Sequence, residues 1–334
     1  SVYYNPEISG GQGLSQARGV AGFTNGETFR IGSTEPVVYH ARFFIQQHFN
    51  FDKKHVTFFE DGVNQVKQQV SDNRLTVTLG KISLADFFDK NSFSHDTRSQ
   101  FMNWSLMSNG AWDYPADTRG YTKGFIAEWF YYSWAFRWAT TMVPLKANGL
   151  QLDDNIAQAH GETFEVEKNW RLNKLPGVAR ILVFANTSQA PTYQEAIANA
   201  QKGDSVASLV VGGLYAWCKY GNTKYGYGMN LEQYIHPNIG LFFKTSWNDG
   251  KSATWAFTEI DQSTSLGVHV SGSFWNRKDD NIGLGYVENG ISKEHQDYLK
   301  AGLNGFIIGD GKLNYGKELI LETYYKAKLL QHIF

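Results

Sequence analysis

Residues 37–51 alternate between apolar and polar side chains with a period of two. The odd positions are Val37, Tyr39, Ala41, Phe43, Ile45, Gln47, Phe49 and Phe51, and the even positions include His40, Arg42, Gln46, His48 and Asn50. A period of two places these sets on opposite faces of a β-strand. Strands of soluble proteins are about 5–6 residues long, whereas a strand that crosses a bilayer obliquely has about 9–11 residues in its core. The length of this segment therefore favours a membrane-crossing strand, with Tyr39 and Phe43 facing lipid and Arg42 facing a lumen.

The same alternation returns in roughly a dozen segments of the chain. The segments are residues 74–79, 134–142, 225–232, 239–248, 266–274 and 319–329, with parts of 121–131, 162–172, 178–187, 281–288 and 302–309. Their apolar faces include Trp134, Phe136, Trp138, Leu241 and Phe243, and their polar faces carry glycine and single charges such as Arg137 and Lys244. A transmembrane barrel requires an apolar band with aromatic girdles outside and a polar interior. The pattern predicts an all-β fold and favours an outer-membrane antiparallel β-barrel over a soluble all-β protein.

The composition excludes several other classes of protein. Lysine and arginine total 31 and aspartate and glutamate total 32, and the resulting net charge of −1 argues against a nucleic-acid-binding protein. The longest nearly apolar stretch, residues 206–218, is shorter than the run of about 20 residues that a membrane-spanning helix needs. Cys218 is the only cysteine, which excludes an intrachain disulfide framework and a cysteine metal cluster.

Two short helices and one long irregular interval interrupt the alternation. Thr192 and Ser292 are each placed to cap a short polar helix, over residues 193–200 and 293–299, and both helices are expected in loops. Residues 85–120 show no clear alternation. A long irregular segment inside a compact domain is usually functional or disordered, and the aromatic content of this one argues against disorder. We therefore expect this interval to form a loop that folds into the pore.

Motifs of enzymes and metal sites are weak in this chain. Gly11 and Gly13 match the first two glycines of a dinucleotide-binding loop, but Gln16 stands where the third glycine is required. Residues 310–314 resemble the start of a calcium-binding loop, but Tyr315 stands where the tight turn of such a loop requires glycine. Glu165 and Glu167 could serve glycoside hydrolysis, yet in a strand they share one face and are better explained as lumen charges. The sequence predicts no catalytic residue, no metal site and no cofactor.

Residues 79–89, LGKISLADFFD, resemble a signature of the carbohydrate-selective porins of the OprB family. Residues 94–104, SHDTRSQFMNW, and residues 109–121, NGAWDYPADTRGY, continue the resemblance. Further matches at residues 5–11, 228–233, 247–250 and 306–311 follow in order along the chain. The resemblance implies a Gram-negative outer-membrane channel of about sixteen strands, through which mono- or oligosaccharides diffuse passively. It also implies contact with outer-membrane lipid and lipopolysaccharide.

Members of this family begin before the position of Ser1 and continue beyond that of Phe334. Bacterial single-chain barrels have an even number of strands, and the alternating segments here come to an odd count of about thirteen. We therefore expect residues 1–334 to form a single β-barrel domain that lacks terminal strands of the full-length protein. In that case the first and last strands do not pair with each other.

A sugar is polar at its edges and apolar on its ring faces, so a sugar path requires aromatic platforms beside hydrogen-bonding charges. Arginine supplies a fixed fork of donors, and carboxylates accept from hydroxyl groups. The candidates on strands are Arg42, Arg74, Glu128, Arg137, Glu165, Glu167, Arg180, Lys244 and Glu322. The candidates in the irregular interval are Asp96, Arg98, Trp104, Trp112, Asp113 and Arg119, of which the tryptophans are expected to stack on sugar.

Two alternatives to a sugar porin remain at this point. One is a secreted or periplasmic all-β carbohydrate-binding protein or glycoside hydrolase, which would need no detergent for extraction. The other is a structural or adhesive outer-membrane barrel with a plugged lumen, which would not conduct ions. The preferred sugar, a calcium ion in a loop, and the choice between monomer and homo-oligomer are left open by the sequence.

Overall fold

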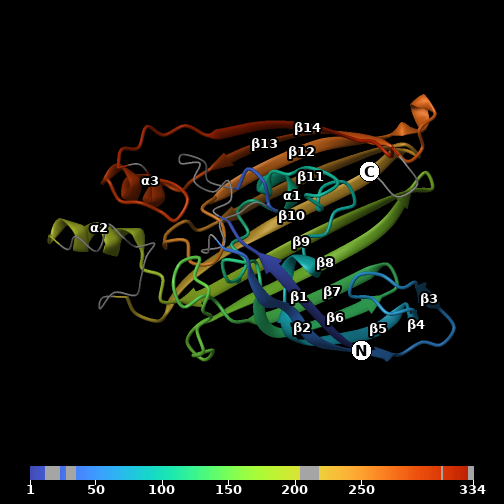
Figure 1. The fold of residues 1–334 in the computed structure, drawn as a ribbon, viewed down its shortest axis with the longest axis horizontal. Helices are drawn as coiled ribbons and strands as arrows, with labels where there is room; N and C mark the ends of the chain where they lie inside the picture. Colours follow the sequence, from blue (N-terminus) through green and yellow to red (C-terminus); the bar gives the residue numbers. More distant parts are fainter. Residues whose placement is uncertain (12–22, 28–34, 204–217, 310, 330–334) are drawn as a thin grey trace.

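The computed structural model describes residues 1–11, 23–27, 35–203, 218–309 and 311–329. Within them, twelve strands form one antiparallel sheet in the order β1-β2-β5-β6-β7-β8-β9-β10-β11-β12-β13-β14 (Figure 1). These are β1 (Val2–Ser9), β2 (Val37–Asn50), β5 (Asn73–Ile82), β6 (Thr122–Tyr131), β7 (Trp134–Thr141), β8 (His160–Leu172), β9 (Leu175–Ser188), β10 (Asn222–His236), β11 (Ile239–Asn248), β12 (Gln262–Ser271), β13 (Asn281–Gly290) and β14 (Glu318–Lys326). A separate hairpin of β3 (Val56–Phe59) and β4 (Gln68–Ser71) lies between β2 and β5 in the chain. The predicted all-β antiparallel fold is confirmed.

The strands follow one another up and down and form a curved wall (Figure 1). β1 pairs only with β2, and β14 pairs only with β13, so the first and last strands described do not pair, as expected from the sequence. None of the helices in the described part of the chain has the length and hydropathy of a membrane-spanning helix.

The two ends of the wall differ in the length of their connections. Residues 132–133 join β6 to β7 and residues 173–174 join β8 to β9, whereas the opposite end carries α2 (Tyr193–Gln201) and α3 (Lys293–Lys300). We call these the short-turn end and the long-loop end. Both helices were predicted, and both begin at the predicted caps: the Thr192 hydroxyl accepts from the Glu195 N–H at 3.1 Å, and the Ser292 hydroxyl accepts from the His295 N–H at 3.0 Å.

The helix α3 is anchored at the long-loop end by a buried histidine. His295 Nδ1 lies 3.0 Å from Asp261 Oδ2, and the imidazole stacks on Tyr193 of α2 with ring centroids 4.5 Å apart. Burial raises the pKa of Asp261, but the hydrogen bond and the charge of His295 outweigh burial, so this pKa lies below its usual range. The pairing therefore favours an ionised carboxylate beneath α3.

Residues 302–309 do not form the strand that their alternation suggested. Glu259 Oε2 accepts from the backbone N–H groups of Ile307 and Ile308 at 2.6 and 2.9 Å, which ties these residues to the β11–β12 connection. Both side chains are buried in the long-loop core, so their apolar character reflects loop packing. The nearly apolar stretch 206–218 lies outside the described residues except for Cys218.

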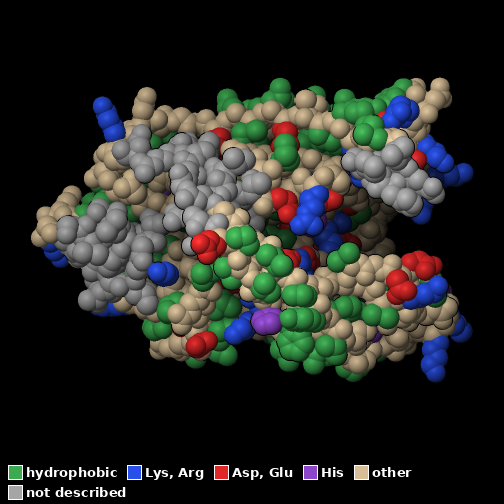
Figure 2. Space-filling model, in the orientation of Figure 1, with side chains coloured by type: hydrophobic (Ala, Val, Ile, Leu, Met, Phe, Trp, Pro, Cys, Tyr) green, Lys and Arg blue, Asp and Glu red, His purple; other side chains and the backbone are tan. Residues whose placement is uncertain are grey.

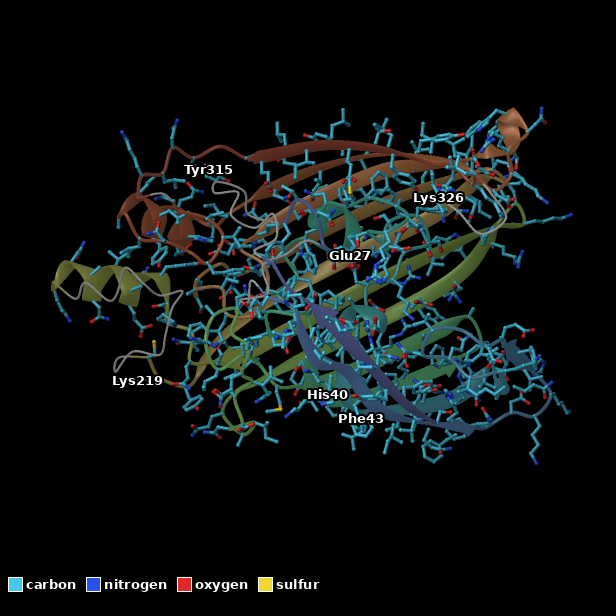
Figure 3. The ribbon with its side chains drawn as sticks, in the orientation of Figure 1. Glu27, His40, Phe43, Lys219, Tyr315 and Lys326 are labelled. Atoms are coloured by element: carbon cyan, nitrogen blue, oxygen red, sulfur yellow. The ribbon has the colours of Figure 1, made fainter. Side chains whose placement is uncertain are left out.

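The outer face of the sheet carries the apolar side chains that the alternation predicted. Phe43 is 55% exposed and points away from the wall (Figure 3), and Trp134, Trp138 and Leu241 are exposed as well. Phe136 and Phe243 are half-buried on the same face as these residues. The charged residues Arg42, Arg137 and Lys244 lie on the opposite, inner face, where Arg137 and Lys244 are buried.

Tyr39 is the exception, since it faces inward. Asn5 pairs with Arg42 and Pro6 pairs with His40, so Ala41 is an extra residue on β2 and forms a β-bulge. One extra residue exchanges the two faces of a strand from that point on. The prediction that Tyr39 faces lipid was therefore wrong, because the bulge places it on the same face as Arg42.

Candidate functional site

The connection between β5 and β6, residues 83–121, enters the space inside the curved wall (Figure 1). We call it the inward segment. It contains η1 (Leu84–Asp86) and α1 (Trp104–Met107) but no strand, which confirms the interpretation of residues 85–120 as irregular chain. Asn103 begins α1, because its side chain accepts from the Ser105 N–H at 3.0 Å.

Charged residues of the wall hold the inward segment by its backbone. Lys244 of β11 donates to three carbonyl oxygens, those of Ser94, Leu106 and Met107, at 2.8, 3.1 and 2.8 Å. Two glutamates accept from backbone N–H groups: Glu322 of β14 from Met102 and Asn103 at 2.7 and 3.0 Å, and Glu165 of β8 from Asp89 at 2.7 Å. Buried backbone groups need such partners, so these side chains brace the segment.

A buried network of charges crosses the inner face of five strands. Its members are Glu128 of β6, Arg137 of β7, Glu165 and Glu167 of β8, Arg180 of β9 and Glu232 of β10. Arg137 lies 3.1 Å from Glu128, 2.9 Å from Glu165 and 3.0 Å from Glu167. Arg180 lies 2.9 Å from Glu167 and 3.3 Å from Glu232. Glu128 and Arg137, Arg137 and Glu165, and Glu167 and Arg180 are direct cross-strand partners, so the sheet register assembles the network.

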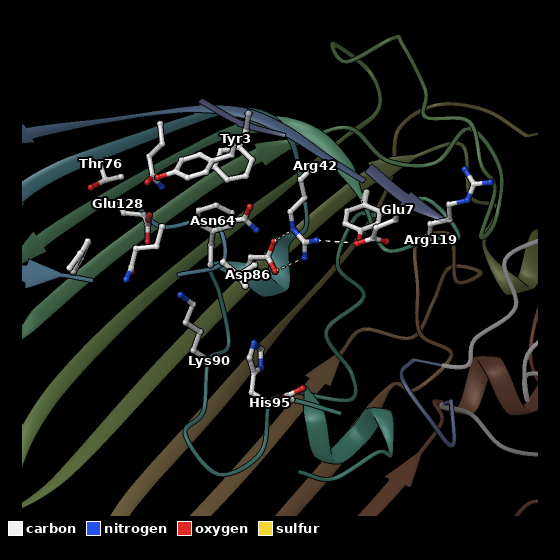
Figure 4. A pocket seen from close by; sticks show the side chains of 18 of the residues that line it. Tyr3, Glu7, Arg42, Asn64, Thr76, Asp86, Lys90, His95, Arg119 and Glu128 are labelled. Carbon is white, nitrogen blue, oxygen red and sulfur yellow. Dashed lines mark hydrogen bonds and ion pairs between the residues drawn. The ribbon is translucent and has the colours of Figure 1, made fainter. Parts of the chain in front are cut away.

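A cavity of about 1120 Å³ lies between the inward segment and the wall formed by β1, β2, β5 and β6. Arg42 stands at its centre and is bound to Asp86 through Nε at 2.6 Å and Nη2 at 2.9 Å (Figure 4). Glu7 of β1 accepts from the hydroxyl groups of Tyr39 and Tyr121 at 2.6 and 2.7 Å and lies 3.4 Å from Arg42. These contacts join the wall to the inward segment across the cavity.

The charges that line this cavity are balanced among the described residues. Five are cationic, namely Arg42, Arg74, Lys90, Arg98 and Arg119, and five are anionic, namely Glu7, Glu27, Asp86, Asp96 and Glu128. Figure 2 shows charged side chains of both signs in the hollow of this face. Seven aromatic side chains also line the cavity: Tyr3, Tyr39, Phe44, Phe59, Phe87, Tyr121 and Phe130. The lining can therefore offer donors, acceptors and apolar ring faces to one solute.

The sequence matches the family model described as carbohydrate-selective porin, OprB family, over residues 1–334. The chain belongs to the OprB family. A high-pH structure of Pseudomonas putida OprB is similar, with a TM-score of 0.61 and 16% sequence identity, over 90% of this chain and 66% of that chain. At this identity the similarity shows the fold alone.

A second solved structure is more distant. Pseudomonas aeruginosa OpdK with vanillate has a TM-score of 0.30 and 10% identity, over 74% of this chain and 71% of that chain, which is too low for any argument. A search among curated proteins finds no match to the sequence.

Thirteen of the fifteen predicted site residues of this OprB-family chain line the cavity or brace the structure, and Glu128 does both. Arg42, Arg74, Asp96, Arg98, Arg119 and Glu128 line the cavity. Arg137, Glu165, Glu167, Arg180, Lys244 and Glu322 belong to the buried network or brace the inward segment. Asp113 also acts as a brace, because it accepts from the N–H groups of Phe257 and Thr258 at 2.6 and 3.2 Å.

The two predicted tryptophan platforms, Trp104 and Trp112, do not line the cavity. They are 3% and 0% exposed and belong to the core between the inward segment and the long-loop end. Trp104 packs on Phe257 with ring centroids 4.5 Å apart, and Trp112 packs on Tyr114 at 5.1 Å. Both rings are used by the protein interior, so they cannot stack on a sugar.

Several cavity residues were not among the predicted ones. Gln46 and His48 stand on the same face of β2 as Arg42, so the alternation itself contained the signal for them. Asp86 lies within the motif of residues 79–89, but its ion pair with Arg42 is a long-range contact. The alternation placed Tyr39 on the lipid face, because a bulge cannot be seen in the sequence pattern.

Proposed function

We propose that the protein is a water-filled outer-membrane channel through which sugars diffuse, and that it performs no covalent chemistry. The observation that carries this proposal is the cavity between the inward segment and the wall. Its five cationic and five anionic groups admit a neutral polar solute, because neither sign dominates the local field. Residues 42 and 86, with their neighbours, are the constriction that the solute passes.

The geometry of the lining supports hydrogen bonding to a sugar at several points. Guanidinium groups donate and carboxylates accept, so ring hydroxyls of either orientation find partners. Tyr39, Phe59 and Phe130 are half-buried on the same path and can contact the apolar parts of a sugar. A sugar can pass only if each of its contacts with the lining is weak and many such contacts follow one another. The polar groups of the lining are spread along the cavity, which meets this requirement.

A soluble carbohydrate-binding protein or hydrolase is not favoured. Every strand of the large sheet from β5 to β13 carries exposed large apolar residues, for example Leu79, Phe164 and Leu284. Such a surface fits lipid and lipopolysaccharide better than water. Glu165 is fully buried beside Arg137, so it has no access to a glycosidic bond.

The test is single-channel conductance of the full-length protein in planar bilayers, with glucose or maltose added. We expect stable conductance that falls as either sugar occupies the channel. R42A should change the sugar block, because it removes the central donor and frees Asp86. The matched control is R277A, which removes an arginine at the β12–β13 turn, outside the cavity. A protein that does not conduct would refute the channel, and conductance without sugar block would refute the sugar path.

A further inference from the structure

The carboxylates and the cations that line the cavity differ in how they are satisfied. Each of the five carboxylates accepts a hydrogen bond from the protein: Glu7 from Tyr39, Tyr121 and Arg42, Asp86 from Arg42, Glu128 from Arg137, Glu27 from Arg98, and Asp96 from Ser99. Two of the five cations, Arg42 and Arg98, make these ion pairs. Arg74, Lys90 and Arg119 have no carboxylate within ion-pair distance among the described residues.

Two of these three cations are held by aromatic rings. The guanidinium of Arg74 lies 3.8 Å from the ring centroid of Phe130, and that of Arg119 lies 4.2 Å from the ring centroid of Tyr39. Stacking on a ring fixes the plane of a guanidinium without using its N–H donors. The Nε atoms of Arg74 and Arg119 have no hydrogen-bond partner, while Nη1 of Arg74 donates to the carbonyl oxygen of Ser71 at 3.0 Å. Both residues line the cavity, so their remaining donors are available there to an anionic group.

The three cations are spread along the cavity rather than gathered in one place. Arg119 precedes β6 at the long-loop end, and Arg74 is the second residue of β5 at the short-turn end. Lys90 extends from the inward segment into the same cavity (Figure 4). Its side chain is exposed, and no ion pair or hydrogen bond of its ammonium group is present in the described part of the chain. An anion that moves through the cavity would therefore meet three cations that make no ion pair with a described carboxylate.

We propose that this row of Arg119, Lys90 and Arg74 makes the channel prefer sugars that carry a carboxylate or phosphate group over neutral sugars of the same size. The inference rests on the proposed function and specifies its substrate class. The balanced total charge still admits neutral sugars, and four of the five carboxylates of the lining are paired with an arginine, whereas Asp96 accepts from the Ser99 hydroxyl. The fork of a guanidinium binds a carboxylate or phosphate through two parallel hydrogen bonds, which a neutral hydroxyl cannot reproduce.

The test compares two sugars that differ in one group, glucose and glucuronate, on the full-length protein in planar bilayers. Block by each sugar and the reversal potential in a potassium chloride gradient are measured for the wild type and for R119Q, K90Q and R74Q. The control R277Q removes the same charge at the β12–β13 turn, outside the cavity. Glucose 6-phosphate as a third solute distinguishes phosphate from carboxylate recognition.

We expect the wild-type channel to prefer chloride over potassium and to be blocked by glucuronate at lower concentration than by glucose. Each variant of the row should weaken glucuronate block about two- to fivefold, with a smaller effect on glucose block, and R277Q should not. The difference between the sugars should shrink in about 1 M salt, because salt screens these contacts. A channel that glucose and glucuronate block equally, or whose three variants match R277Q, would overturn this inference alone. A protein without conductance would overturn the proposed function with it.

Discussion

At the scale of single residues, Arg137 joins three carboxylates of the inner face. It is buried and lies within 3.1 Å of Glu128, Glu165 and Glu167. Removal of one partner from a buried ion pair leaves an uncompensated charge, which typically costs about 3–5 kcal/mol. We expect R137M to lower the free energy of unfolding by about that amount, measured by denaturant titration in detergent.

The control for this prediction is R277M. Arg277 is half-exposed and pairs with Asp280 in the β12–β13 turn, where solvent screens the pair, so little change is expected. If R137M and R277M lowered the free energy of unfolding equally, the burial of Arg137 would not matter for stability.

Trp112 allows a second prediction at this scale. Its ring is fully buried, so W112A should lower the free energy of unfolding by about 3–5 kcal/mol, and W112F should lower it less, because it fills part of the cavity left by the indole. In channels that remain folded, sugar block should equal that of the wild type. A stable W112A channel with weakened sugar block would restore the tryptophan to the sugar path.

At the scale of the element, each strand has a lipid face whose tolerance for charge depends on depth. Phe243 lies near the middle of β11, and Ile239 begins the same strand on the same face. Arginine at the bilayer midplane costs about 2–4 kcal/mol in a transmembrane barrel, and about 0–1 kcal/mol near the interface. We expect F243R to destabilise the folded protein by the larger amount and I239R by the smaller. Refolding into lipid vesicles with denaturant titration measures both, and a larger loss in I239R would contradict the assigned depth.

At the scale of the whole molecule, the difference between the two ends predicts the orientation in the membrane. Transmembrane barrels place short turns in the periplasm and long loops outside the cell. Lys300 at the end of α3 and Lys174 in the β8–β9 turn are both exposed, at the long-loop and short-turn ends. In a C218S background, a membrane-impermeant maleimide should label K300C on intact cells. It should label K174C only after the outer membrane is permeabilised. The reverse pattern of labelling would invert the orientation.

The sequence alone determined the faces of most strands and the positions of both loop helices. Side-chain alternation is set by the sterics of one strand, so Phe43, Trp138 and Leu241 could be assigned outward without knowledge of their neighbours. The caps of α2 and α3 are equally local, because Thr192 and Ser292 bind backbone groups three residues away. The irregular character of residues 85–120 was visible for the same reason, as an absence of period.

Only the tertiary structure decided how those elements make a site. The inward turn of Tyr39 depends on a bulge that exists because β2 pairs with β1, and the burial of Trp112 depends on packing against distant parts of the chain. Likewise, Ile307 and Ile308 lie in a loop and not in a strand, because their backbone N–H groups donate to Glu259. Which of the lining charges form ion pairs among the described residues, as Arg42 does with Asp86, is also a long-range property. Local sterics fix which way a side chain points, but its partners are set by contacts between residues far apart in the sequence.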